Sequence, residues 1–212
     1  MSDIDSTPAT SNEVEDTEAV NIQAANQASS GENAIRFFPV SEGKLITLYI
    51  VSFGMYAIYW FYKNWTLQQE SMEEKIRPFW RAIFSIFYTH SLFKRIHQQA
   101  SNLEKKHQFN ANVYATLFVA AIVISNIIDR LTMNSNMFES SSQNSLVIIS
   151  LVLFFVSIYP LVKVQATVNR INNDMLGFLN HKYSIWNYLL IALGCILWVL
   201  FGLGILNESL MS

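Results

Sequence analysis

The strongest constraint on this chain is a set of four long runs that contain no charged residue. They cover residues 45–62, 109–128, 145–162 and 183–206. The hydrocarbon core of a bilayer is about 30 Å thick, and a helix of 18 residues already rises about 27 Å. Each run therefore has close to the length that a helix needs to cross a membrane. The sequence predicts an all-α integral membrane protein with four transmembrane helices.

The composition excludes an ordinary soluble domain. Only 14% of the 212 residues are charged and 51% are hydrophobic, whereas about 25% of the residues of a soluble domain are charged. The single cysteine, Cys195, lies in the last apolar run. An intrachain disulfide is therefore impossible, and a small buried apolar residue is the expected role of Cys195.

The end of the first run is crowded with aromatic residues. The stretch 56–65 reads YAIYWFYKNW, in which six rings surround one lysine. Tyrosine and tryptophan concentrate where the bilayer meets water, and a lysine there can extend its ammonium toward the headgroups. We therefore expect Trp60, Lys63 and Trp65 to lie at the membrane interface.

The first part of the chain has a different character. Residues 1–34 contain no aromatic residue, lysine or arginine, but carry seven acidic residues among small polar ones. Such a segment cannot bury enough apolar surface to offset the entropy lost on ordering. We expect a disordered acidic tail over 1–35 and a membrane domain over 36–212.

A shorter apolar segment follows the first run. Residues 78–96 read PFWRAIFSIFYTHSLFKRI, and the uncharged part, 82–93, is only 12 residues long. Twelve helical residues rise about 18 Å, too little to cross a bilayer. The pattern favours an amphipathic helix that is interfacial or re-entrant, with a fifth span as the alternative. Its flanking residues Trp80, Arg81, Lys94 and Arg95 are candidates for contact with lipid.

The lysines and arginines predict an orientation. With four spans, the segments 63–108 and 163–182 carry all of the 14 basic residues except Arg36, Lys44 and Arg130. Because basic loops are retained in the cytoplasm, both termini are then expected outside. A fifth span over 82–93 would move the amino terminus inside.

The spans offer packing groups rather than an ion path. They contain no Asp, Glu, Lys, Arg or His side chain. This argues against a transporter, because transporters usually hold such groups in the membrane. Asn126, Gly194 and Gly202 are the residues that we expect to serve helix packing. The segment after the third span carries an apolar stripe, so this span is expected to continue as an amphipathic helix that ends near Gly177.

The sequence contains none of the short motifs that mark catalytic, metal or nucleotide sites. His90 and His97 stand seven residues apart, but Lys94 between them opposes a bound cation. We therefore expect no catalytic residue, metal or cofactor and no enzymatic activity. Aromatic and basic residues are also typical of nucleic-acid binding, but beside a span they point to anionic lipid instead.

Five short motifs occur in order along the chain: FFPVS at 37–41, YWFYKNW at 59–65, PFWRA at 78–82, SLFKRI at 91–96 and VNRIN at 168–172. Together they resemble a family of uncharacterised bacterial multi-pass membrane proteins of unknown function. The resemblance covers most of the chain after Ile35 and implies a multi-pass protein of the bacterial inner membrane. It implies no activity and no site residue.

These observations together predict a non-enzymatic membrane component. Its expected partners are the bilayer, anionic lipid headgroups and either a protein partner or further copies of the chain. A small transporter or channel subunit that acts as an oligomer is the alternative.

Overall fold

The computed structural model describes residues 36–103, 109–132 and 140–211. These residues form helices and connecting turns, with no strand among them. The prediction of an all-helical protein is confirmed for this part of the chain. The expected disordered tail over 1–35 lies outside the described residues.

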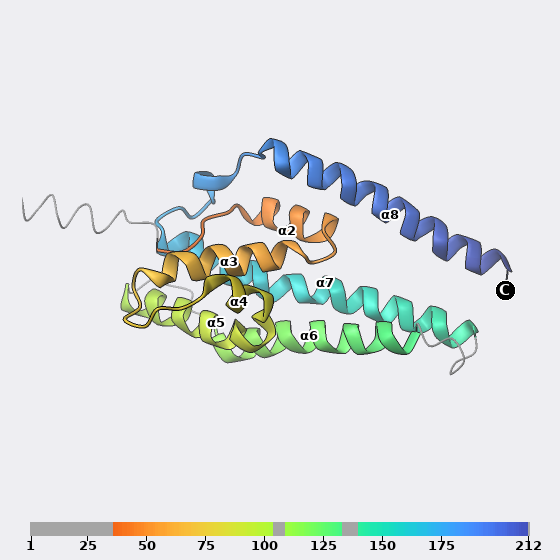
Figure 1. The fold of residues 1–212 in the computed structure, drawn as a ribbon, viewed down its shortest axis with the longest axis horizontal. Helices are drawn as coiled ribbons and strands as arrows, with labels where there is room; N and C mark the ends of the chain where they lie inside the picture. The colour runs from red at the N-terminus through yellow and green to blue at the C-terminus, as the bar shows by residue number, and fades with distance from the viewer. Residues whose placement is uncertain (1–35, 104–108, 133–139, 212) are drawn as a thin grey trace, which may run out of the picture. The chain divides into compact units, whose positions relative to one another are not determined.

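Three of the described helices are long and apolar enough to cross a membrane. They are α6 (Ala111–Thr132), α7 (Ser140–Ile171) from Ser145 onward, and α8 (Ile185–Met211) as far as Ile205. They correspond to the predicted spans 109–128, 145–162 and 183–206. Helices α6 and α7 lie side by side (Figure 1), and few of the apolar side chains of α8 are buried against protein. Such exposed apolar helices are compatible with a membrane protein.

The first predicted span, 45–62, is not a single helix. The chain forms α2 (Glu42–Val51), turns, and continues as α3 (Tyr56–Gln69), so that the two helices form a hairpin (Figure 1). In the turn, φ is +51° at Phe53 and +84° at Gly54. The Gly54 N–H closes the end of α2 by donating to the Tyr49 carbonyl at 2.8 Å. A left-handed glycine commonly ends a helix in this way, because it lacks the Cβ that disfavours positive φ.

The segment before the hairpin, 36–41, is extended and is held by side-chain amides. No helix or sheet satisfies its backbone, so buried carbonyl and N–H groups need other partners. Asn172 and Asn64 accept hydrogen bonds from backbone N–H groups, and four amides donate to carbonyls. These donors are Gln68 to Arg36, Asn172 to Phe37, Gln165 to Phe38 and Asn169 to Val40, over 2.7–3.2 Å.

The same segment contacts the stretch of chain that connects α7 with α8. Residues 36–40 contact Asn172 and Asn180, which belong to the stretch that connects α7 with α8. Lys44 adds a further link, because its ammonium donates to Asn180 Oδ1 and to the Lys182 carbonyl, both at 2.7 Å. Burial at this contact lowers the pKa of Lys44. The four-span prediction placed these two regions on opposite sides of the membrane; it is not confirmed, because the two regions are in contact and a hairpin replaces the single helix expected over 45–62.

The segment 78–96 is also broken. It contains α4 (Pro78–Ile83) and α5 (Ser85–Asn102), separated at Phe84, rather than one helix. Pro78 occupies the first turn of α4, where its missing N–H costs no hydrogen bond. Helix α5 buries one stripe against α6 and α7, formed by Leu92, Phe93, Ile96 and Ala100.

Helix α7 continues well beyond the hydrocarbon-length run 145–162. Its 32 residues rise about 48 Å, and Pro160 lies inside it without ending it. The predicted continuation of the third span is confirmed, although the helix ends at Ile171, before Gly177. At Gly177, φ is +70°, and an added Cβ would lie 2.9 Å from the Ser41 backbone nitrogen. The extended segment 36–41 therefore passes where only glycine leaves room for it.

Candidate functional site on helices α4 and α5

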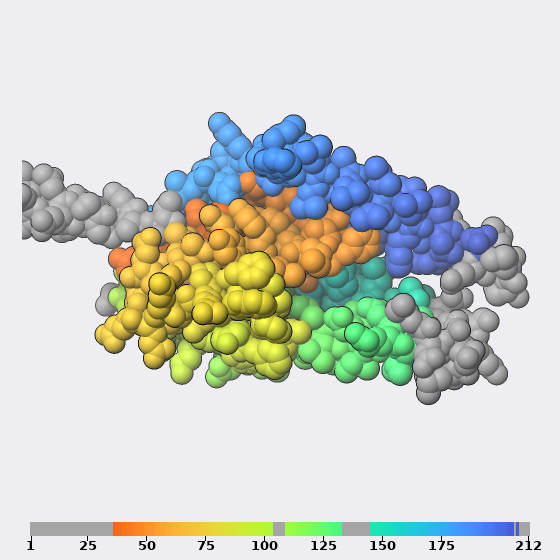
Figure 2. Space-filling model, in the orientation of Figure 1, coloured from red at the N-terminus to blue at the C-terminus, as the bar shows by residue number. Residues whose placement is uncertain are grey.

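Helix α4 and the first turn of α5 expose large apolar side chains, and this part of the chain lies on the face of the protein that Figure 2 shows in yellow. Phe87 is 78% exposed and Trp80 is 50% exposed. Soluble proteins rarely expose so many large apolar side chains together. The exposed members of this surface are Phe79, Trp80, Ile83, Phe84, Ile86, Phe87 and Tyr88; we call it the aromatic face.

The exposed residues of α5 change from aromatic to polar along the helix. Phe87 and Tyr88 stand near its start, whereas Lys94 is exposed and Arg95 half-buried farther on. The seven residues from Phe87 to Lys94 rise about 10 Å. A helix of this kind can hold its aromatic end in hydrocarbon while its cations stay among the headgroups.

Arg81 is held between two aromatic rings. Its guanidinium carbon lies 4.6 Å from the ring centroid of Trp65 and 5.1 Å from that of Tyr88. Cation–π contacts of this kind stabilise a cation by about 0.5–2 kcal/mol without neutralising it. Among the described residues no carboxylate forms a salt bridge with Arg81. The site therefore offers a positioned and uncompensated positive charge beside the aromatic face.

Two tryptophans expected at the interface belong to the core instead. Trp60 and Trp65 are fully buried, and the Trp60 indole N–H donates to Gln165 Oε1 at 2.5 Å. The prediction that they face the membrane interface is wrong. Their rings pack inside the protein because the hairpin brings α3 against α4, α5 and the extended segment. Lys63 is half-buried, and its ammonium lies 5.8 Å from the ring centroid of Phe38.

The three residues expected to serve helix packing have different surroundings. Gly194 lies against Val51 at the end of α2, and a Cβ added there would lie 2.7 Å from the Val51 Cβ. A Cβ added at Gly202 would meet no described atom within 4 Å. The Asn126 amide donates to the Ile122 carbonyl of its own helix at 2.8 Å rather than to a neighbouring helix.

Sequence reasoning missed Tyr88, which forms the second ring around Arg81. The two residues are seven apart, a spacing that places side chains on one face of a regular helix. The contact with Trp65 has no comparable signal, because it depends on how α3 packs on α4.

The described residues contain no group of three or more His, Cys, Asp or Glu side chains placed to hold a metal ion. The chain matches no family model, no curated protein and no solved structure. The resemblance to uncharacterised bacterial membrane proteins therefore stays a prediction.

Proposed function

We propose that this protein is a non-enzymatic, multi-pass component of the bacterial inner membrane that engages anionic lipid headgroups. The observation that carries the proposal is the Arg81 guanidinium, held by two rings and free of a carboxylate partner among the described residues. Phosphate groups are the anions of lipid headgroups, and arginine binds them with two parallel hydrogen bonds. Lys94 and Arg95 add positive charge farther along α5.

The charge distribution supports one orientation. With α6, α7 and α8 as the spans, every lysine and arginine of the 14 except Arg130 falls before α6 or within 163–182. Under the positive-inside rule, these segments face the cytoplasm. The asymmetry is greater than with four spans, because Arg36 and Lys44 move to the basic side. We propose that the amino terminus is cytoplasmic and the carboxyl terminus external.

Thiol labelling tests this orientation. In a Cys195→Ser background, a cysteine at Ser11 is expected to stay protected from an impermeant thiol reagent in intact spheroplasts and to react after lysis. Ser71→Cys, between α3 and α4, provides the cytoplasmic control, and Ser135→Cys, between α6 and α7, provides the external one. Labelling of position 11 before lysis, with both controls as expected, would support the four-span prediction. It would contradict the three-span arrangement, in which the hairpin does not cross the membrane.

Loss of the Arg81 charge is expected to weaken binding of anionic lipid. A cation near an anionic surface contributes about 1 kcal/mol, which corresponds to roughly a five-fold change in affinity. For Arg81→Gln in detergent, we therefore expect the Kd for phosphatidylglycerol, measured by native mass spectrometry, to rise about five-fold. Binding should also weaken with added salt, because salt screens charges near the surface.

The matched control is Arg130→Gln, which removes the same charge in the last turn of α6, outside the aromatic face. It should leave the Kd unchanged. An equal loss in both variants, or no loss in Arg81→Gln, would contradict a specific site at Arg81. A stoichiometric copurifying protein in place of lipid would favour a protein partner, and substrate-dependent flux in proteoliposomes would favour the transporter alternative.

A further inference from the structure

A cavity of about 680 Å³ lies between the hairpin, α5, α6, α7 and α8. Its volume lies within the range typical of sites for small molecules and lipid-like ligands. Along α6 the lining runs from Asp129 to Phe118, a separation of 11 positions that corresponds to a rise of about 16 Å. The cavity thus extends from near the end of α6 at Thr132 toward the middle of the helix. If α6 crosses a bilayer, the first position lies at the depth of a headgroup and the second at the depth of an acyl chain.

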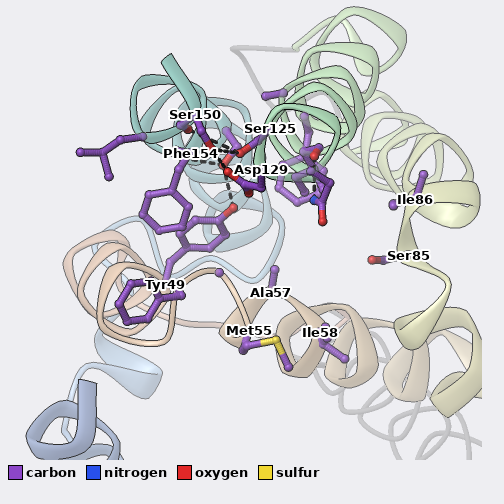
Figure 3. A pocket seen from close by; sticks show the side chains of 18 of the residues that line it. Tyr49, Met55, Ala57, Ile58, Ser85, Ile86, Ser125, Asp129, Ser150 and Phe154 are labelled. Carbon is purple, nitrogen blue, oxygen red and sulfur yellow. Dashed lines mark hydrogen bonds between the residues drawn. The ribbon is translucent and has the colours of Figure 1, made fainter. Parts of the chain in front are cut away.

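The two sides of the cavity differ in chemistry (Figure 3). Hydroxyl and carboxylate groups come from the face where α6 and α7 meet, represented by Ser125, Asp129 and Ser150. The hairpin contributes apolar side chains opposite them, including Met55 and Ile58. An occupant that fits both sides must be amphiphilic.

The polar groups form an ordered chain of hydrogen bonds that ends at a carboxylate. The Ser125 and Ser150 hydroxyl oxygens lie 2.8 Å apart, and the Ser150 hydroxyl donates to Asp129 Oδ1 at 2.5 Å. The donor capacity of Ser150 is therefore directed at Asp129 and fixes one oxygen of its carboxylate. The Asp129 carboxylate is held by Ser150 on a helix of membrane-spanning length, and it is therefore a candidate for ligand binding.

The charge of the lining is unbalanced. Among the described residues that line the cavity, Asp129 is acidic and none is lysine, arginine or histidine. Asp129 Oδ2 carries no hydrogen bond that the described residues supply. Asn126 stands one turn away on α6 and uses its amide nitrogen on Ile122, which leaves its Oδ1 as an acceptor. The lining of this largely apolar cavity therefore includes two acceptors, the Asp129 carboxylate and Asn126 Oδ1, which are three residues apart on α6, and the carboxylate carries a negative charge.

We propose that this cavity binds a phospholipid with a primary ammonium headgroup, an ethanolamine lipid of the surrounding bilayer. The ammonium lies at Asp129 and donates to Asp129 Oδ2 and Asn126 Oδ1, and one acyl chain follows α6 toward Phe118. An ammonium supplies the N–H donors that these acceptors need. A choline headgroup has the same charge but no N–H donor, and a glycerol headgroup has no positive charge. This selection is independent of the anionic-lipid site at Arg81.

The test compares three lysolipids with the full chain in detergent. Lysophosphatidylethanolamine should form a one-to-one complex in native mass spectra and raise the melting temperature, because a ligand that binds only the folded state stabilises it. The choline and glycerol analogues should bind at least ten-fold more weakly, as expected for loss of a hydrogen bond to a charged group. Equal binding of the ethanolamine and choline lipids would overturn the proposal.

Asp129→Asn tests the carboxylate, because the amide keeps the shape of the side chain and an acceptor for Ser150. It should weaken ethanolamine-lipid binding about ten-fold, whereas Glu73→Gln, at an exposed position outside the cavity, should not. A second variant, Ile122→Trp, fills the cavity and should abolish the complex while Asp129 remains. Unchanged binding in both Asp129→Asn and Ile122→Trp would overturn the proposal, as would binding of dodecylamine without binding of the ethanolamine phospholipid.

Discussion

A Gly194→Ala substitution is expected to lower the melting temperature of the protein in detergent, whereas Gly202→Ala should leave it unchanged or raise it. The two glycines are eight residues apart on α8 and look equivalent in the sequence. A methyl group at Gly194 would collide with the carbonyl oxygen of Val51 and would lie 2.7 Å from the Val51 Cβ. At Gly202 the same methyl group meets no described atom within 4 Å.

The collision at Gly194 cannot be relieved by a small side-chain movement. The backbone of Val51 is the obstacle, and neighbouring contacts fix α8 against the hairpin. The Trp198 indole N–H donates to the Ile50 carbonyl at 2.9 Å, and its ring stacks on Phe53 with centroids 4.5 Å apart. Overpacking of such a contact costs about 1–3 kcal/mol. At Gly202, alanine should instead gain about 0.5–1 kcal/mol, because glycine is a poor helix former.

The measurement is a thermal melt of both variants and the parent protein, followed by tryptophan fluorescence. Opposite signs are the expected result. If Gly194→Ala melted at the temperature of the parent protein, α8 would not pack against the end of α2 as described.

Replacement of Gln165 by leucine is expected to have the largest effect on stability. Gln165 is fully buried on α7 and connects three elements. It accepts from the Trp60 indole at 2.5 Å, and its amide donates to the Phe38 carbonyl at 3.2 Å and to Asn169 Oδ1 at 2.7 Å. Leucine has a similar volume but leaves all three buried groups without this partner. Each unsatisfied group costs about 1–3 kcal/mol, so the total loss is expected to reach several kcal/mol.

The control is Gln98→Leu, which makes the same chemical change at an exposed position of α5. It should change the free energy of unfolding by less than about 0.5 kcal/mol. The free energies of unfolding of the Gln165→Leu and Gln98→Leu variants are compared by denaturation in a mixed-micelle titration. Equal stability of Gln165→Leu and Gln98→Leu would show that the extended segment 36–41 does not depend on the amides of α7.

The comparison of Gly194 with Gly202 also shows the limit of sequence reasoning about packing. The spacing of the two glycines predicted one common face, and both residues do lie on α8. Which of them touches a neighbour depends on where α2 ends, and that position follows from a turn formed by other residues. The Arg81 site also depends on how separate elements pack, since its two rings come from α3 and α5. A residue pattern within one helix can name the aromatic and basic side chains, but it cannot state which of them meet.

The sequence by itself determined where the long helices are. Length and apolar content are local properties, and comparison with the thickness of a bilayer identifies α6, α7 and α8 as helices long and apolar enough to cross one. It also determined the strong asymmetry of positive charge. Neither result requires knowledge of which residues touch.

Only the tertiary structure decided that the run 45–62 turns back instead of continuing as one helix. Leu45, Leu48 and Tyr49 of α2 are buried against protein, although hydropathy scores them as it would score residues facing lipid. Hydrocarbon and a protein core are both apolar, so hydropathy cannot distinguish a helix that crosses a membrane from one that packs among its neighbours. The left-handed turn at Phe53 and Gly54, and the amides on α7 that hold 36–41, make the hairpin the arrangement that satisfies the buried backbone.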